Sequence, residues 1–219
     1  LDLRKIDFKI NFKNRLLSYT LMTLIVIFCL NISDIAIRHL IENRVSGADA
    51  GYWTAMNGVS KIYMQFTAAV FPLYILPIYS KFSSTYEFRE EVLKIYKMLL
   101  PVLFIGMIVV FLLRQVIIRT LYTSEFLEMA VLFKWQLTGD FIRFIGLVIS
   151  YQFIAKRQVS NYIFTELLYI ALFYGFSLYF IDIYNTEGVV IAHASRSIIY
   201  LLVVFYMLRG SLLGQKKVL

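Results

Sequence analysis

Charged side chains lie in the middle of long apolar stretches of this 219-residue chain. An ionic side chain at the centre of a lipid bilayer costs about 2.5–3.5 kcal/mol on translocon-insertion scales. A bundle of helices that carries several such residues needs a polar interior, which predicts a route or pocket for something polar. The residues concerned are Asp34, Arg38, Lys61, Asp140, Arg143 and Arg196.

The first two apolar stretches carry polar residues at helical spacing. Asp34 and Arg38 are four residues apart, so one helix face presents both. They form either a self-neutralising pair or a polar lining whose arginine can leave Asp34 for a passing anion, and we favour the lining. Asn57, Lys61 and Gln65 also recur every four residues. No residue of the same helix neutralises Lys61, and it is too deep to reach the membrane surface easily, so we predict a function for it.

Three later stretches carry further polar residues. Asp140 and Arg143 are three residues apart, which predicts a structural ion pair within one helix. Glu166 is a further candidate, although it is expected one turn from the cytoplasmic end of its stretch, where solvation is the simpler explanation. His193 and Arg196 share a helix face, and structural and functional interpretations of them stay open. Asp140, Arg143 and Arg196 are secondary candidates for a binding site.

The apolar stretches predict an all-α fold, a polytopic membrane bundle of six transmembrane helices. Hydrophobic residues make up 60% of the chain, against about 45–50% in soluble domains. Open strands cannot satisfy their backbone in lipid, so the spans are helices. Pro72 and Pro77 should kink the second span. The predicted spans are 19–41, 52–79, 95–118, 129–154, 161–181 and 188–208.

Basic residues outside the spans set the predicted topology. Residues 1–18 are basic and amphipathic, as expected of an interfacial helix or of a linker from an earlier membrane domain, and 209–219 form a basic tail. The positive-inside rule places both ends of this segment in the cytoplasm and the acidic loop Asp182–Glu187 outside. The net charge of +8 is spread over many loops, which argues against nucleic-acid binding.

Sequence signals for catalysis are absent. The chain has no Gly-rich phosphate loop, no zinc-ligand spacing and no nucleophile elbow. Its two histidines and one cysteine argue against a metal site or a disulfide framework. We therefore expect no enzyme activity, no metal and no cofactor.

Two groups of sequence blocks resemble Wzx-type polysaccharide flippases. Gly51-Tyr52-Trp53, Lys61 to Phe66 and Leu76 to Lys81 are similar to the eighth helix of that family. Leu121 to Phe126 and Trp135 to Asp140 are similar to the loop and tenth helix of its O-antigen and enterobacterial common antigen branch. The order and spacing of these blocks carry the resemblance, which extends over essentially the whole chain.

The resemblance implies the multidrug/oligosaccharidyl-lipid/polysaccharide exporter superfamily, whose members have two six-helix lobes around a central cavity. This chain would be the C-terminal lobe (19–208), preceded by an interlobe linker (1–18). The family moves undecaprenyl-diphosphate-linked oligosaccharide across the bacterial inner membrane for O-antigen or related lipopolysaccharide biosynthesis. The implied partners are the lipid-linked oligosaccharide, membrane lipids, the N-terminal lobe of the same protein, a polysaccharide polymerase and a chain-length regulator.

Carried over by position, the resemblance places a substrate-binding cavity on the first two helices of the lobe. Its residues would be Arg38, Lys61, Asp34, Asn57 and Gln65. The cations would hold the diphosphate, and the amides would bind sugar hydroxyls. Asp34 would tune Arg38 or, alternatively, titrate and couple transport to protons. The bent second span would be a moving part of alternating access.

Two rival functions remain open. A drug or metabolite antiporter of the same superfamily would favour carboxylates in its cavity, whereas deep cations outnumber deep anions here. A membrane-embedded glycosyltransferase or polysaccharide ligase would need catalytic groups at the membrane surface and usually a large outer loop, but the predicted outer loops are short. A purely structural subunit is disfavoured by the deep Lys61.

Overall fold

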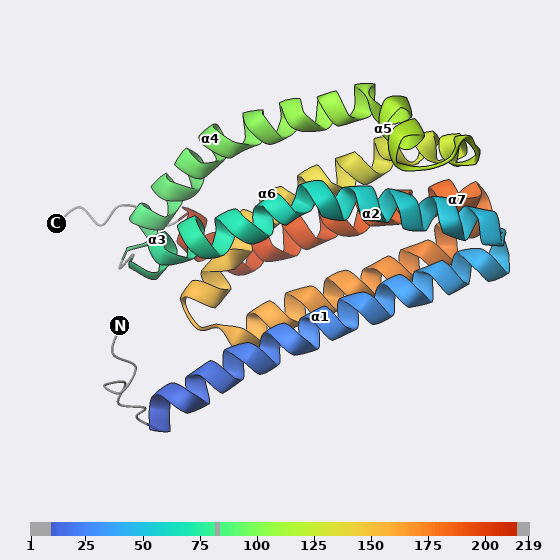
Figure 1. Ribbon diagram of the computed structural model, residues 1–219. Coiled ribbons are helices and arrows are strands. Elements are labelled where there is room, and N and C mark those ends of the chain that lie inside the picture. Colours follow the sequence, from blue (N-terminus) through green and yellow to red (C-terminus); the bar gives the residue numbers. More distant parts are fainter. Residues whose placement is uncertain (1–9, 82–83, 214–219) are drawn as a thin grey trace, which may run out of the picture.

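A computed structural model describes residues 10–81 and 84–213, and every regular element in those ranges is helical (Figure 1). The predicted all-α class is therefore confirmed for this part of the chain. Four helices are long and apolar enough to cross a membrane: α1, α4, α6 and α7. In chain order the elements are α1 (Ile10–Arg44), α2 (Gly47–Val70), a π-helical segment (Phe71–Ile75), α3 (Leu76–Lys81), α4 (Thr85–Leu112), α5 (Arg114–Leu121), a 3-10 helix (Ser124–Val131), α6 (Phe133–Ala155) and α7 (Val159–Leu213).

α7 consists of two legs that reverse direction at Asn185. The backbone there has φ 51° and ψ −137°, which is not helical. The first leg runs beside α1, and the second leg, red in Figure 1, returns through the bundle. The Tyr200 hydroxyl on the second leg donates a hydrogen bond of 3.2 Å to Glu166 on the first, so the legs lie side by side. The reversal falls inside the predicted loop Asp182–Glu187.

The reversal presses Gly188 against the preceding leg. A methyl group at this position would overlap the carbonyl oxygen of Phe180 and lie 2.9 Å from the amide nitrogen of Ile181. Overpacking of this kind typically costs about 1–3 kcal/mol. We therefore expect Gly188→Ala to lower the midpoint of thermal unfolding in detergent. Gly175→Ala, whose methyl group meets open space, is the control, and equal midpoints for the two variants would contradict the prediction.

The prolines of the second predicted span coincide with a change of helix type. Pro72 lies in the first turn of the π-helical segment, where its missing N–H removes an ordinary α-helical hydrogen bond. α3 follows directly and contains Pro77. The expected departure from regular α-helix therefore takes the form of a π-helical turn.

α4 begins earlier and ends sooner than the predicted span 95–118. Its first turn is fixed by a capping box: the Ser84 hydroxyl accepts from the Glu87 amide at 3.2 Å, and the Glu87 carboxylate accepts from the Ser84 amide at 3.4 Å. The helix breaks at Leu113, where φ is −87° and ψ is 3°, and α5 begins after it. The predicted single span therefore crosses a helix boundary that its uniform hydrophobicity did not reveal.

The flanking segments are only partly described. α1 is continuous from Ile10, so the second half of the predicted linker 1–18 belongs to the same helix as the first span. α7 extends to Leu213, past the expected start of the tail at residue 209. Residues 1–9 and 214–219, the rest of the predicted linker and tail, lie outside the described residues.

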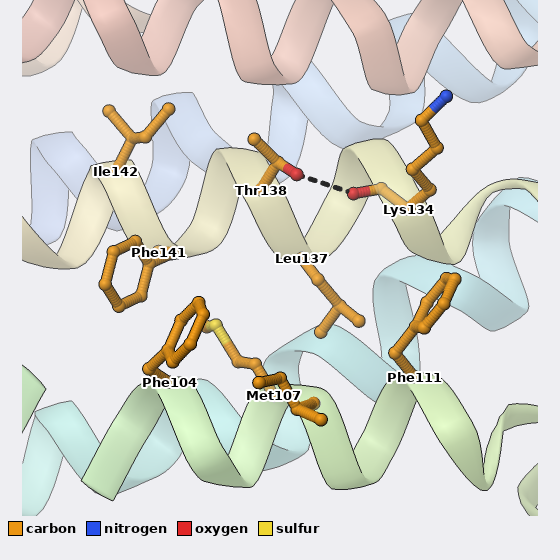
Figure 2. A pocket seen from close by; sticks show the side chains of 9 residues that line it. Phe104, Met107, Phe111, Lys134, Leu137, Thr138, Phe141 and Ile142 are labelled. Atoms are coloured by element: carbon orange, nitrogen blue, oxygen red, sulfur yellow. Dashed lines mark hydrogen bonds between the residues drawn. The ribbon is translucent and has the colours of Figure 1, made fainter. Parts of the chain in front are cut away.

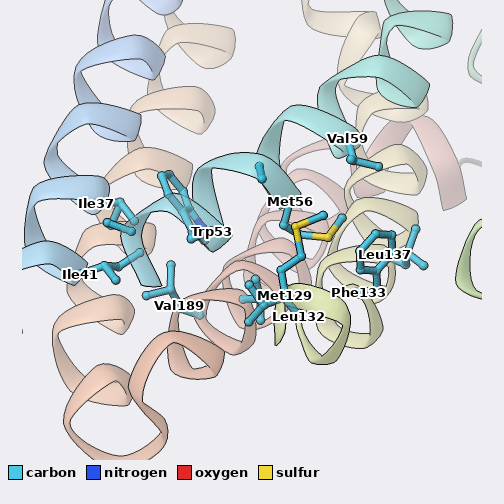
Figure 3. Close-up of a cluster of buried hydrophobic side chains, with 14 of the residues drawn as sticks. Ile37, Ile41, Trp53, Met56, Val59, Met129, Leu132, Phe133, Leu137 and Val189 are labelled. Atoms are coloured by element: carbon cyan, nitrogen blue, oxygen red, sulfur yellow. The ribbon is translucent and has the colours of Figure 1, made fainter. Parts of the chain in front are cut away.

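α6 is the central helix of the bundle. Of its apolar window 61% is buried, against 17% for α4. One hydrophobic cluster joins α1, α2, α6 and both legs of α7 (Figure 3), and its members include Ile37, Trp53, Met56, Phe133 and Val189. A second cluster joins the π-helical segment, α4, α6 and α7, and its members include Phe71, Phe88, Phe144, Phe153 and Tyr200. These two clusters fix α2 and α7 around α6.

Candidate functional site

An exposed polar cluster joins α1 to α2. The Lys61 Nζ lies 2.6 Å from Oδ2 of Asp34, and the Asn57 amide donates to the same oxygen at 3.3 Å. The Lys61 side chain is 58% exposed and that of Asp34 is 30% exposed. Of the two interpretations of Asp34 and Arg38, the self-neutralising pair is therefore not formed, because Asp34 pairs with Lys61 instead. Lys61 is neutralised from the neighbouring helix.

The hairpin of α1 and α2 explains this pairing. The two helices are joined by a short turn at Val45 and Ser46, so residues at equal distances from the turn lie opposite each other. Asp34 and Asn57 are each eleven residues from it. Lys61 lies one helical turn farther along α2, and its flexible side chain reaches back to Asp34. Helical spacing within one segment cannot show such a partner.

Arg38 and Gln65 extend the same polar face. Arg38 lies one turn from Asp34 on α1, and Gln65 one turn from Lys61 on α2, and both side chains are exposed. Among the described residues Arg38 forms no ion pair. The structure thus brings the five predicted cavity residues onto one face of the α1–α2 hairpin. We call this face the hairpin face, comprising Asp34, Arg38, Asn57, Lys61 and Gln65.

Asp140 belongs to a separate, buried network. Its carboxylate accepts hydrogen bonds from the Ser60 hydroxyl at 2.6 Å and from the Tyr63 hydroxyl, both on α2. The Nε2 atom of His193 on α7 lies 2.9 Å away. The prediction that Asp140 pairs with Arg143 is therefore wrong. The two side chains leave α6 toward different neighbours, and each finds its partner there.

Arg143 pairs with Glu166 across α6 and the first leg of α7. Its Nη2 lies 2.8 Å and 2.6 Å from the two carboxylate oxygens, and both side chains are nearly fully buried. The guanidinium lies against the rings of both Tyr169 and Tyr200, at 3.9 Å and 3.8 Å from their centroids. The expectation that solvent stabilises Glu166 is wrong, because the residue is only 1% exposed. This pair holds three helical segments together.

Arg196 is connected to Asp140 through an imidazole. Its Nε and Nη2 lie 3.2 Å and 3.0 Å from Nδ1 of His193. A guanidinium has no acceptor, so Nδ1 must accept, and the proton on Nε2 is donated to Asp140. The Arg196 guanidinium also stacks 3.5 Å from the ring centroid of Phe173. Of the two open interpretations of His193 and Arg196, the contacts therefore favour a structural role in a buried chain of charges.

Glycines on α6 allow this network to form. A methyl group at Gly139 would lie 2.7 Å from Nε2 of His193, and one at Gly146 would lie 2.8 Å from the ring of Tyr200. Sequence reasoning missed the hydroxyl donors of the network, Ser60, Tyr63 and Tyr200, because such residues are common in membrane helices. Their position opposite the deep charges is visible only after the helices pack. In the described part of the chain, no group of three or more His, Cys, Asp and Glu side chains is placed so that it could hold a metal ion.

Comparison with known families decides the class of this membrane protein. The model of a family described as polysaccharide biosynthesis protein matches residues 3–131, which is more than half of the chain. The chain belongs to the polysaccharide biosynthesis protein family. The match covers α1, α2, α4 and α5, so it includes the hairpin face. No solved structure gives a significant match to the chain.

Two curated relatives of this family member are lipid III flippases by name. The proteins from Escherichia coli strain K12 and from Shigella flexneri are each 32% identical to the chain over 186 residues. Those residues are 85% of this chain but 45% of each relative. The chain therefore spans less than half the length of the curated relatives that it matches.

Proposed function

We propose that this polysaccharide biosynthesis protein is the C-terminal lobe of a flippase that moves undecaprenyl-diphosphate-linked oligosaccharide across the bacterial inner membrane. The product would serve O-antigen or related surface polysaccharide synthesis. The lipid III flippases similar to the chain support transport over catalysis. The single observation that carries the proposal is the exposure of the charged hairpin face at membrane depth.

The depth of the hairpin face follows from helix geometry. Asp34 lies eleven residues from the turn between α1 and α2, about 16 Å at the helical rise of about 1.5 Å per residue. That distance is close to the middle of a hydrocarbon core about 30 Å thick. Exposed charges at this depth would be strongly disfavoured in lipid, so they face water or another part of the protein. A polar cavity between two lobes satisfies this requirement.

Each residue of the hairpin face has a role in this proposal. Arg38, which has no carboxylate partner in the described ranges, holds one phosphate by paired N–H donors. When substrate enters, Lys61 releases Asp34 and forms an ion pair with a second phosphate. Asn57 and Gln65 donate to and accept from sugar hydroxyls, as amides can do both. The polyprenyl tail stays in lipid between the lobes.

The lobe itself would have six crossings in this proposal. They are α1, α2 with α3, α4, α6 and the two legs of α7, which include the four helices long and apolar enough to span. With basic residues on the cytoplasmic side, both ends of the segment would be cytoplasmic. The N-terminal lobe of the full-length protein would close the other side of the cavity.

Neutralising the two cations tests the cavity assignment. In the full-length protein in its host, Arg38→Gln and Lys61→Gln should each reduce surface polysaccharide, and the double variant should nearly abolish it. A lost charge-assisted hydrogen bond weakens binding by about 1.5–3 kcal/mol, which is about tenfold to a hundredfold. The measurement is surface polysaccharide at matched membrane expression, with lipid-linked repeat units in the inner leaflet as the second readout.

Lys97→Gln is the matched control, since Lys97 is an exposed lysine on α4, away from the hairpin face. It should leave surface polysaccharide unchanged. Accumulated lipid-linked repeat units in the double variant would support a cationic flippase cavity. Normal polysaccharide in that variant would show that Arg38 and Lys61 do not hold the substrate.

A further inference from the structure

α4 is the most apolar of the potential spans and the least packed. Its apolar window has a mean hydropathy of 2.4, yet only 17% of that window is buried. Figure 1 shows α4 at the top of the bundle, with α1 at the opposite side. Its side chains do not fill the space between it and the bundle, so that grooves remain along α6.

The first groove lies between α4 and α6 (Figure 2) and has a volume of about 360 Å³. Phe104, Met107 and Phe111 face it from α4, and Leu137 and Phe141 from α6. Lys134 stands at one end of the groove, with its amine pointing away from the apolar lining. The groove is therefore an apolar slot with a single cation at its mouth.

A second groove continues along the same two helices. It has a volume of about 410 Å³ and lies between α4, α6 and the second leg of α7. Val92 and Tyr96 line it from α4, and Ile145 and Ile149 from α6. Arg89 is its basic residue, near the start of α4. The second groove, like the first, is therefore an apolar slot with one cation, and this cation lies at the other end of α4.

The two grooves match the two leaflets of a bilayer. Arg89 and Phe111, which line opposite grooves on α4, are 22 residues apart. At about 1.5 Å per residue this is about 33 Å, close to the thickness of a hydrocarbon core of about 30 Å. The cations at the outer ends of the grooves therefore lie at the levels of the two headgroup layers.

Neither cation is neutralised within the described ranges. Lys134 and Arg89 form no ion pair there, and the Lys134 amine lies 4.6 Å from the ring centroid of Trp135. The Thr138 hydroxyl in the first groove is already used, since it donates to the Lys134 carbonyl at 2.8 Å. An apolar slot that ends in an unpaired cation at headgroup level is complementary to a lipid with an anionic phosphate.

We propose that the seam between α4 and α6 binds two anionic glycerophospholipids, one in each leaflet. The phosphate of one lipid pairs with Lys134 and that of the other with Arg89, and an acyl chain of each fills the adjoining groove. The chains complete the packing of α4 that its own side chains leave unfinished, through van der Waals contact. The seam lies away from α1 and is distinct from the hairpin face, so this proposal does not depend on the transported substrate.

Trp135 offers a direct reporter of the Lys134 site. We would reconstitute the full-length protein in vesicles of brominated phosphatidylglycerol or brominated phosphatidylcholine and measure tryptophan quenching. The signal of a Trp135→Phe variant is subtracted to isolate Trp135. Brominated phosphatidylglycerol should quench Trp135 several-fold more effectively at low mole fraction, and Lys134→Gln should remove this preference. Thr138→Phe, which fills the groove without changing the charge, should reduce quenching by both lipids.

Arg89→Gln is the matched control in this experiment, because it removes a cation at the other end of the seam. It should leave Trp135 quenching unchanged but reduce by one the anionic phospholipids retained by the purified protein in native mass spectrometry. Equal quenching by the two lipids in the wild type would overturn the proposal. So would quenching by neither lipid, as expected if another part of the protein covers the seam, or displacement of phosphatidylglycerol by added polyprenyl diphosphate.

Discussion

Glu166→Gln is expected to be among the most destabilising single substitutions in this chain. It leaves the guanidinium of Arg143 buried against two aromatic rings without its carboxylate, which in the wild type lies 2.6 Å away. Removing one partner of a buried ion pair typically costs about 3–5 kcal/mol. The measurement is the free energy of unfolding or the thermal midpoint in detergent, together with the amount of protein in the membrane.

A double variant separates the buried charge from the shape of the site. Arg143→Met with Glu166→Leu removes both charges and fills similar space, and such replacements are often neutral or stabilising by about 1–4 kcal/mol. We expect it to be much more stable than Glu166→Gln alone. Glu90→Gln on the exposed face of α4 is the matched control. If Glu166→Gln unfolds at the wild-type midpoint, the pair is not the connection between α6 and α7 described above.

Exchanging the charges of Asp34 and Lys61 is expected to separate folding from transport. Asp34→Lys alone places three cations on the hairpin face, and Lys61→Asp alone places two carboxylates there. The double exchange restores an ion pair across α1 and α2, so the protein should reach wild-type levels in the membrane. Transport should stay at least tenfold lower, because a substrate phosphate no longer finds a cation on α2.

The readouts are membrane level and surface polysaccharide in the full-length protein. Asp34→Asn is the companion variant: it frees Lys61 without moving a charge to another helix, and it should retain more transport than the double exchange. Full transport by the exchanged pair would show that the interaction of Asp34 with Lys61 is only structural. In that case Arg38 would be the remaining cation of the proposed cavity.

Helix content was predictable because lipid offers no hydrogen-bond partners to the backbone. Long apolar stretches must satisfy their own hydrogen bonds, so an all-α class follows from composition alone. The reversal at Asn185 was also visible as a polar interruption between apolar runs. Helix ends were less predictable, because capping at Ser84 extends α4 through charged residues, and the break at Leu113 interrupts an apolar run.

The hairpin face was predictable as a set, and its contacts were not. A spacing of three or four residues correctly indicates which side chains share a helix face. The same spacing wrongly suggests that opposite charges within one helix form an ion pair with each other. Asp34 and Asp140 both have such a neighbour, and both pair instead with a residue of another helix. At a helix–helix contact, a side chain can lie closer to a residue of the facing helix than to the residue one turn away in its own helix.

The sequence by itself determined that this protein is a helical membrane protein with polar residues on its first two spans. The length of an apolar stretch, the position of its charges and their spacing are properties of a single segment. They are the same however the helices pack against one another. Only the tertiary structure decided which charges are exposed and which are buried. Lys61 is exposed and Glu166 is buried, although each is one charge in an apolar stretch. The difference arises because the burial of a side chain depends on which other helices pack against its own helix. The sequence of one segment does not show which helices those are.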